Sequence, residues 1–381
     1  MGTFLTSLDT GAIRIASACG LCHPDTVAPV WRRRTAMSGR RMGWVAGAVA
    51  LAVGCGCAEK KPVLHLYTWS DYVKPELVQR FERENHCRVV IDTYDSNEAM
   101  YAKLRAGATG YDLLFPSSYM VKIMDEQGML RRLDPAQLPN LRNIDPAYLA
   151  MAVDRAMDHS VPYTVTLTGL GYLGGKVENF EPTWAMLDRE DLRGRMTMLN
   201  DHRETIGAAL KFLGYSLNTL DDRELAEAKA VVLRWKKNLA KFENEQYKNG
   251  LASGEFRLVH GYSGDLMLVQ SENEDIQIAI PREGAALSFD DMVIPAGARQ
   301  IELAHRFINF VLDPHVAAEL TEFIYFLCPN EVSYQHLSAE LREDPILFPP
   351  PEVVEKLEMI GDLGEGNAKY AKLWDEIKAG E

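Results

Sequence analysis

The sequence predicts an α/β protein with two lobes, two crossover strands at a hinge and a cleft between the lobes. A chain of 381 residues is long for a single hydrophobic core, so two lobes are expected. Patterns typical of strands alternate with patterns typical of helices in both halves of the chain. Extended stretches at residues 161–175 and 287–297 connect these halves. Two such crossings between α/β lobes make a hinge.

The first half of the chain alternates strands and helices. Apolar, β-branched runs predict strands at residues 63–69, 88–94 and 111–117. Amphipathic patterns predict helices at residues 74–86, 95–107 and 119–127. The second of these helices opens with a capping pattern in which Asp95 precedes Glu98 by three residues. The β-α-β-α-β order predicts a parallel sheet with helices on both faces.

The second half repeats this alternation and predicts a second α/β lobe. The expected strands span residues 195–201, 256–262 and 276–281. The expected helices span residues 204–213, 222–239 and 265–272. These elements divide the chain into lobe 1, at residues 58–167 and 290–341, and lobe 2, at residues 168–289 and 342–381.

The N-terminal segment has the pattern of an export signal. Arg40 and Arg41 precede an uncharged run of 13 residues, Met42 to Gly54. A membrane-spanning helix needs about 20 residues, whereas a secretory signal sequence matches this length and charge. The stretch "LAVGC" resembles a bacterial lipobox and predicts lipidation at Cys55, although its Leu lies one position earlier than usual. Residues 1–54 are therefore a predicted leader and lipoprotein signal, and translation from Met37 would omit residues 1–36.

The cysteines do not predict a haem site or a disulfide framework. Residues 19–23 spell CxxCH, the attachment motif of c-type haem, but export by the signal would remove this string. Beyond Cys55 the chain contains only three more cysteines, Cys57, Cys87 and Cys328. This odd and sparse number does not suit a disulfide framework.

The charge of the chain is uneven. The net charge is −13, with six Arg and two Asp in residues 1–54, so the remainder carries −17. An acidic body repels nucleic acid and anionic membrane surfaces and speeds the arrival of cations. The acidity would be equally explained if it served only to keep the protein soluble.

Aromatic and acidic side chains follow the predicted strands. Because the carboxyl ends of parallel strands direct loops into the same crevice, four loops and the returning crossover are expected at the cleft. The loops are Trp69–Tyr72, Pro116–Tyr119, Asp201–Glu204 and Tyr262–Asp265, and the crossover supplies Asp290. Arg203 is the only basic residue of this set. Carboxylates accept hydrogen bonds from ammonium groups and aromatic faces attract cations, so the set suits a cationic ligand with apolar methylenes.

Each of these residues also has a structural interpretation. Trp69 and Tyr72 would serve equally as core aromatics. Asp201 and Glu204 have the spacing of a helix capping box, and Asp71 would cap the helix that begins near Lys74. Asp290, which precedes another aspartate, would form part of a solvated pair.

Motifs for catalysis are weak. Residues 261–265, "GYSGD", approach a GxSxG nucleophile elbow, but Asp265 replaces the second Gly. The nine His residues lack metal-ligand spacing, and the chain has no P-loop and no GxGxxG motif. We therefore expect no catalytic residue, no metal and no cofactor. Sugar binding and hydrolysis of a glycoside by an acid pair remain alternatives.

Five stretches, taken in order, resemble one known family. They are "YTWSDYV", "DTYDSNEAMYAKLRAG", "YDLLFPSSYMV", "GYSGD" and "IPREGAALSFDDMVIPAGA". The chain resembles the periplasmic spermidine/putrescine-binding proteins of polyamine ABC transporters from about Val63 to Lys378. The resemblance implies a type II periplasmic binding protein fold and a receptor that delivers polyamine to ABC permease subunits and catalyses nothing. It also implies a monomer outside the cytoplasm, periplasmic or extracytoplasmic, which the lipid anchor would hold at the membrane, with no nucleic-acid partner.

The resemblance implies eleven ligand-binding residues: Trp69, Ser70, Asp71, Tyr72, Ser117, Tyr119, Asp201, Glu204, Tyr262, Asp265 and Asp290. By analogy, Asp265 and Asp290 each pair with an ammonium group, whereas Asp201 and Glu204 serve a longer polyamine. Three positions depart from the family pattern. Tyr262 replaces a Trp, Ser288 stands where Trp or Phe is usual, and Phe326 stands where a Tyr hydroxyl is expected.

Overall fold

The structure is a computed structural model that describes residues 61–380. The predicted signal sequence, the lipidation site Cys55 and the CxxCH string lie outside the described residues. Within residues 61–380, no helix is both long enough and apolar enough to cross a bilayer.

The first lobe contains the strands and helices that the first half of the sequence predicts. Its strands are β1 (Val63–Thr68), β2 (Arg88–Thr93) and β3 (Leu113–Leu114). Its helices are α1 (Pro75–Glu84), α2 (Asn97–Arg105), α3 (Ser118–Glu126) and α4 (Pro146–Leu149), joined later in the chain by α9 (Ile301–Val311) and α10 (Pro314–Ile324). Strand β1 pairs in parallel with both β2 and β3, as the β-α-β-α-β order predicts.

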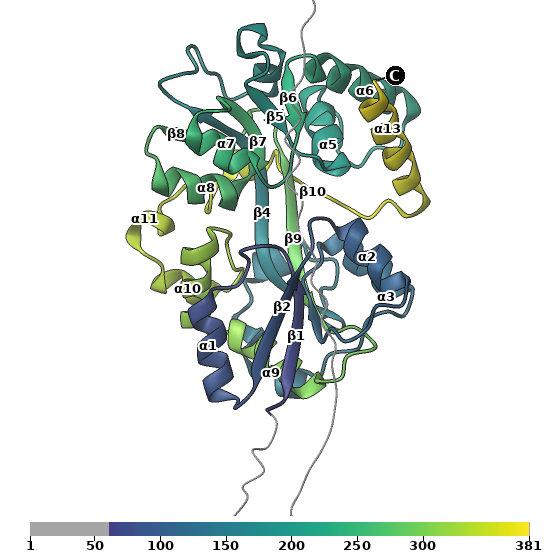
Figure 1. Cartoon of the computed structure of the whole chain (residues 1–381), viewed down its shortest axis with the longest axis vertical. Helices are drawn as coiled ribbons and strands as arrows, with labels where there is room; N and C mark the ends of the chain where they lie inside the picture. Colours follow the sequence, from purple (N-terminus) through teal and green to yellow (C-terminus); the bar gives the residue numbers. More distant parts are fainter. Residues whose placement is uncertain (1–60, 381) are drawn as a thin grey trace, which may run out of the picture. The chain divides into compact units, whose positions relative to one another are not determined.

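The second lobe repeats this arrangement. Its strands are β5 (Met196–Met198), β6 (Leu239–Phe242), β7 (Leu258–Tyr262) and β8 (Ile276–Ala279). Its helices are α5 (His202–Phe212), α6 (Asp222–Lys236), α7 (Tyr247–Ser253) and α8 (Ser263–Glu272). Near the C-terminus, α11 (Ala339–Arg342), α12 (Pro351–Val354), β10 (Glu358–Met359) and α13 (Asn367–Ala379) complete the described elements, apart from short 3-10 turns. Helix α13 packs against α5 and α6 (Figure 1).

Two long strands connect the lobes. Strand β4 (Ser160–Leu173) pairs antiparallel with β9 (Ala286–Val293), from Ser160 opposite Val293 to Leu167 opposite Leu287. The two strands lie side by side between the lobes (Figure 1). The sheet order is β2-β1-β3-β9-β4-β7-β5-β6, so the expected parallel sheets are joined through an antiparallel centre into one mixed sheet. The predicted α/β fold with two crossover strands is confirmed. The exact lobe boundaries remain predictions, because β4 and β9 run through them without a break.

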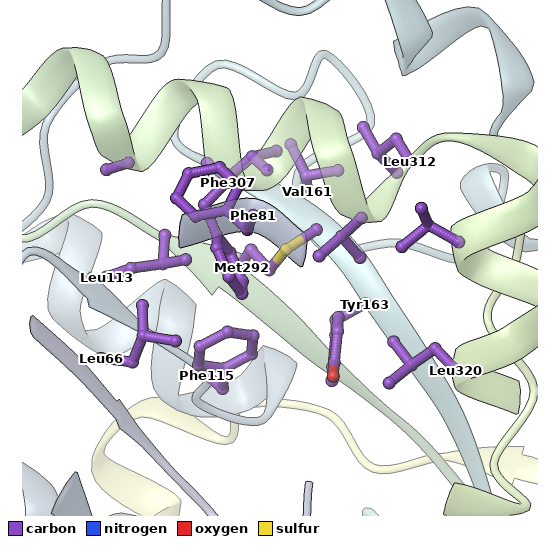
Figure 2. Close-up of a cluster of buried hydrophobic side chains, with 14 of the residues drawn as sticks. Leu66, Phe81, Leu113, Phe115, Val161, Tyr163, Met292, Phe307, Leu312 and Leu320 are labelled. Atoms are coloured by element: carbon purple, nitrogen blue, oxygen red, sulfur yellow. The ribbon is translucent and has the colours of Figure 1, made fainter. Parts of the chain in front are cut away.

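Each lobe has a large hydrophobic core of its own, and three further hydrophobic clusters complete the interior. In the first lobe, β1, β3, the crossover strands and α9 contribute fully buried side chains, including Leu66, Phe115, Tyr163 and Phe307 (Figure 2). The second lobe buries Trp184 and Trp235 together with residues of α5, α6 and α13. The cores fix the strands, and the strands in turn fix the loops that follow them.

Most boundaries shift by a few residues from the sequence prediction, and three of the differences have a clear structural basis. The predicted helix at residues 222–239 ends at Lys236, because the following residues pair as β6 with β5. Helix α2 is capped by Ser96, which accepts a hydrogen bond from the Ala99 backbone N–H, and not by Asp95. Strand β3 is only two residues long.

Candidate functional site

A cavity of about 270 Å³ contains all eleven predicted ligand-binding residues in its wall. The wall combines loops from both lobes with residues of the crossover strands. Its predicted members are Trp69, Ser70, Asp71, Tyr72, Ser117, Tyr119, Asp201, Glu204, Tyr262, Asp265 and Asp290. The structure therefore brings these residues together, and their role in binding remains a prediction.

Strand ends explain why residues so distant in sequence meet here. The loops at residues 69–72, 116–119, 201–204 and 262–265 follow β1, β3, β5 and β7 in turn. Strands β1 and β3 are parallel, as are β5 and β7, so each pair ends at a common edge. The four loops converge on the cavity for this reason.

The first loop presents its aromatic side chains to the cavity. The Trp69 indole N–H donates to the Phe115 carbonyl at 2.9 Å, and its ring makes an edge contact with Tyr94. Asp71 is exposed and adopts a left-handed backbone with φ of 55°. Lys74 occupies the N-cap of α1, which has no side-chain cap. The interpretation of Asp71 as a helix cap is therefore wrong.

Asp290 is a buried carboxylate held by neutral donors. The Tyr72 hydroxyl donates to one of its oxygens at 2.6 Å, and the Ser117 hydroxyl donates to the other at 2.6 Å. Burial raises the pKa of Asp290 to about 6, although both hydrogen bonds lower it. A buried carboxylate supported only by neutral hydroxyls is poised to receive a cation.

The neighbouring Asp291 faces the opposite side of the strand, since successive side chains of a strand alternate. Its carboxylate accepts a hydrogen bond from Ser118, and it does not line the cavity. Asp290 is 8% exposed and Asp291 is fully buried, so the interpretation of the two as a solvated pair is wrong.

Asp201 and Glu204 use their carboxylates differently. Asp201 is the N-cap of α5 and accepts from the backbone N–H groups of Arg203 and Glu204 at 2.8 and 3.1 Å. The Glu204 carboxylate accepts from the Thr168 hydroxyl at 2.9 Å and does not complete a capping box. Burial raises the pKa of Glu204 above its ordinary value, and the nearby charge of Asp201 raises it further. Only Asp201 therefore has a structural cap role.

Asp265 already has a basic partner. The Tyr247 hydroxyl donates to one of its oxygens at 2.7 Å, and the Lys248 ammonium donates to the other at 3.2 Å. Lys248 also lines the cavity, so the expectation that Arg203 is the only basic residue of the site is wrong. Arg203 itself donates to the Gly361 carbonyl and to the Asn218 side chain, and lies over the Tyr370 ring.

Aromatic residues cover the cavity from both lobes. Tyr119 is buried and its hydroxyl donates to Glu98 at 3.0 Å. Half-buried Tyr262 packs against the first-lobe core and against a second-lobe cluster that contains Tyr247 and Leu266. Phe326 lines the cavity and packs edge to face on Tyr72. Ser288 lines the same wall, two residues before Asp290 on the same face of β9. The three departures from the family pattern thus lie at the cavity itself.

The sequence prediction missed several residues of the wall. They are Asp95, Asn97, Thr166, Asn244, Glu245, Lys248, Leu268, Phe323, Ile324 and Ile360, in addition to Ser288 and Phe326, which were noted only as departures. Asp95 follows β2, so the strand-end rule would have found it. Asn244, Glu245 and Lys248 follow β6, whose first residue was assigned to the preceding helix.

Within residues 61–380, no cluster of three or more His, Cys, Asp or Glu side chains is arranged to hold a metal ion. Four carboxylates of the cavity, Asp201, Glu204, Asp265 and Asp290, instead come from α5, α8 and β9 and accept from hydroxyl, backbone N–H or ammonium donors. Their arrangement suits a ligand with several separate donor groups.

Comparison with known proteins identifies the family. Residues 76–349 match the model of the bacterial extracellular solute-binding proteins. The chain belongs to this family. Its members bind solutes and are not enzymes, which removes the glycoside-hydrolase alternative.

Several relatives of this solute-binding protein have names that refer to polyamines. The spermidine/putrescine-binding periplasmic protein of Escherichia coli is 34% identical over 88% of this chain and 97% of its own length. The putrescine/cadaverine-binding protein of Pseudomonas aeruginosa is 35% identical over 88% of this chain and 98% of its own length. The predicted membership of the spermidine/putrescine-binding periplasmic protein family is thereby confirmed.

Solved structures agree with the fold of this solute-binding protein. A putative spermidine/putrescine ABC transporter protein from Listeria monocytogenes has a TM-score of 0.80 and 32% identity, covering 84% of this chain and 99% of that one. A lipoprotein of Treponema pallidum has a TM-score of 0.75 and 35% identity, covering 83% of this chain and 99% of its own.

The one-sided cap of α5 makes a prediction about stability. Asp201→Ala should lower the free energy of unfolding by about 0.5–2 kcal/mol, because two backbone N–H groups lose their acceptor. Glu204→Gln should not lower it, since the amide oxygen still accepts from Thr168 and a buried ionisable group is removed. Urea unfolding of both variants measures the difference. Equal losses of stability in the two variants would instead support a reciprocal capping box, in which Glu204 also caps the helix.

Proposed function

We propose that this protein is an extracytoplasmic receptor that binds a polyamine, putrescine or spermidine, and delivers it to the permease subunits of an ABC transporter. The observation that carries the proposal is the buried Asp290 carboxylate, which has only neutral hydroxyl partners within an acidic, aromatic cavity.

The charges of the cavity favour a ligand with more than one positive charge. Seven carboxylate side chains line it, against the two basic side chains Arg203 and Lys248. Lys248 pairs with Asp265, and Arg203 donates to neutral oxygens. Taking an ammonium group out of water costs several kcal/mol, which a buried carboxylate partner offsets. A neutral sugar could donate its hydroxyls to these carboxylates, but it would leave their negative charges without a counter-charge.

Aromatic side chains supply the second requirement of a polyamine, which is cover for its methylene groups. Trp69, Tyr119, Tyr262 and Phe326 all line the cavity. Each aromatic face attracts a cation by roughly 0.5–2 kcal/mol and also covers CH₂ groups. The relatives named for spermidine, putrescine or cadaverine support the same ligand class.

The N-terminal motif supports a lipid anchor at Cys55, and the lipoprotein from Treponema pallidum provides a precedent among similar structures. In this proposal the mature protein begins at lipidated Cys55, works as a monomer and is held at the membrane outside the cytoplasm. Mass spectrometry of the native N-terminus should detect a diacylglyceryl or triacyl cysteine. An unprocessed chain that starts before Met42 would contradict the anchor.

Calorimetric titration tests the ligand class. Putrescine and spermidine should bind, whereas neutral sugars should not. Asp290→Asn should weaken both polyamines at least about a hundredfold, because the loss of a partner for a buried charge costs about 3–5 kcal/mol.

Asp291→Asn provides the matched control for this titration, since it removes the adjacent carboxylate, which does not line the cavity. Its polyamine affinities should stay within about threefold of wild type, or about 0.6 kcal/mol. Sugar binding without polyamine binding would overturn the proposal. Equal effects of the two substitutions would show that charge alone, and not contact with Asp290, determines affinity.

The raised pKa of Asp290 predicts opposite effects of pH on binding and on stability. The wild-type advantage over Asp290→Asn in putrescine affinity should shrink as pH falls from 7.5 to 5, because Asp290 protonates near pH 6. In the ligand-free protein, folded Asp290 binds its proton more tightly than the unfolded chain does. Its contribution to stability is therefore complete below pH 3.8 and lost as pH rises through about 6. A pH-independent affinity ratio would contradict ionised Asp290 as the ammonium partner.

A further inference from the structure

Lys248 stands out among the cavity residues, because a site for a cationic ligand contains a cation of its own. It is the second residue of α7 and lines the cavity beside Asn244 and Glu245. Its ammonium group lies 3.2 Å from an oxygen of Asp265, and the two side chains are only 16% and 20% exposed. This ion pair is largely shielded from water, unlike a surface pair.

Helix α7 occupies both oxygens of the Asp265 carboxylate. The Lys248 ammonium takes one oxygen, and the Tyr247 hydroxyl donates to the other at 2.7 Å. The same hydroxyl accepts from the Tyr262 backbone N–H at 3.1 Å, which fixes its orientation. Each oxygen of Asp265 therefore has a partner from its own lobe before any ligand arrives.

The surroundings of Lys248 resemble those that a ligand ammonium would require. Burial lowers the pKa of Lys248, but Asp265, Glu245 and Asp71 raise it by more, so the group stays charged. Asp71 belongs to the first lobe and Asp265 to the second, so carboxylates from both sides act on one ammonium group. A ligand ammonium entering here would either displace Lys248, which leaves that charge without its partner, or share one carboxylate with a second positive charge.

We propose that Lys248 is a specificity-determining residue that acts as a built-in ammonium, occupies Asp265 and makes the receptor prefer a diamine over a longer polyamine. The inference rests on the proposed polyamine function. In this arrangement Asp290 binds one ligand ammonium, and the Asp201–Glu204 pair binds the second. A third ammonium gains no net ion pair, because Lys248 already neutralises Asp265. This reverses the expectation from family resemblance that Asp265 binds a ligand ammonium directly.

Lys248→Met tests the proposal, since Met keeps an unbranched side chain and removes the charge. Spermidine affinity should rise by about tenfold or more as Asp265 becomes free, whereas putrescine affinity should change by less than about threefold. Lys241→Met is the matched control. Lys241 pairs with Glu243 on the neighbouring β6 segment and does not line the cavity, so both affinities should remain at wild-type values.

The double variant Lys248→Met/Asp265→Asn completes a thermodynamic cycle. It should lose the gain in spermidine affinity, because the freed carboxylate is gone. Lys248→Gln provides a second neutral variant, and thermal unfolding of each protein identifies any variant that fails to fold.

The possible results separate this inference from the proposed function. A selective gain for spermidine that Asp265→Asn removes supports the built-in ammonium. Equal gains for both ligands, no change, or weaker binding of both in the neutral variants would overturn it while leaving the polyamine receptor intact. Failure of the wild-type protein to bind either polyamine would overturn the proposed function, and this inference with it.

Discussion

Two hydroxyl groups hold the Asp290 carboxylate in a buried position, and the candidate site is built around this contact. Tyr72 lies 218 residues before Asp290 and Ser117 lies 173 residues before it, so the contact joins two loops of the first lobe to the returning crossover. A buried carboxylate is costly unless it is hydrogen-bonded and finally paired with a cation. The hydroxyls supply the first condition, and in our proposal the ligand supplies the second. The Asp290 side chain therefore affects both the stability of the protein and its choice of ligand.

The crossover pair β4–β9 is what makes this contact possible. Antiparallel pairing sets Thr166 opposite Ser288 and Thr164 opposite Asp290. Because side chains alternate along a strand, these residues share the face toward the cavity, and the residues between them face the other side of the sheet. Thr164 in turn lies 2.5 Å from the Tyr72 hydroxyl, which links this face to the first loop. On the opposite wall, α7 supplies Lys248 and α8 supplies Asp265 as a preformed ion pair. The cavity thus contains both an uncompensated carboxylate and one that is already neutralised.

Sequence patterns predicted most of the fold and most of the residues in the cavity wall, but not the hydrogen-bond partners of those residues. Alternating strand and helix patterns located most elements. The strand-end rule placed ten of the eleven residues in one cavity wall, and the returning crossover added Asp290. That rule failed after β6, because Leu239–Phe242 follows a long helix without a Gly or Pro to mark the change. Lys248 was missed with it. The partners of each carboxylate also escaped prediction, since hydroxyls such as Thr168 and Ser117 reach them from distant strands. Spacing alone made Asp201 and Glu204 a capping box, whereas the fold gives Glu204 another partner.

A crystal structure of the protein with bound putrescine would test the central claim most directly. The account predicts one ligand nitrogen within about 2.7–3.2 Å of an Asp290 oxygen, the usual hydrogen-bond range, with methylenes against Trp69 and Tyr262. It also predicts that the Asp290 carboxylate keeps its bonds to Tyr72 and Ser117. A ligand bound outside this cavity, or inside it with no nitrogen near Asp290, would contradict the account.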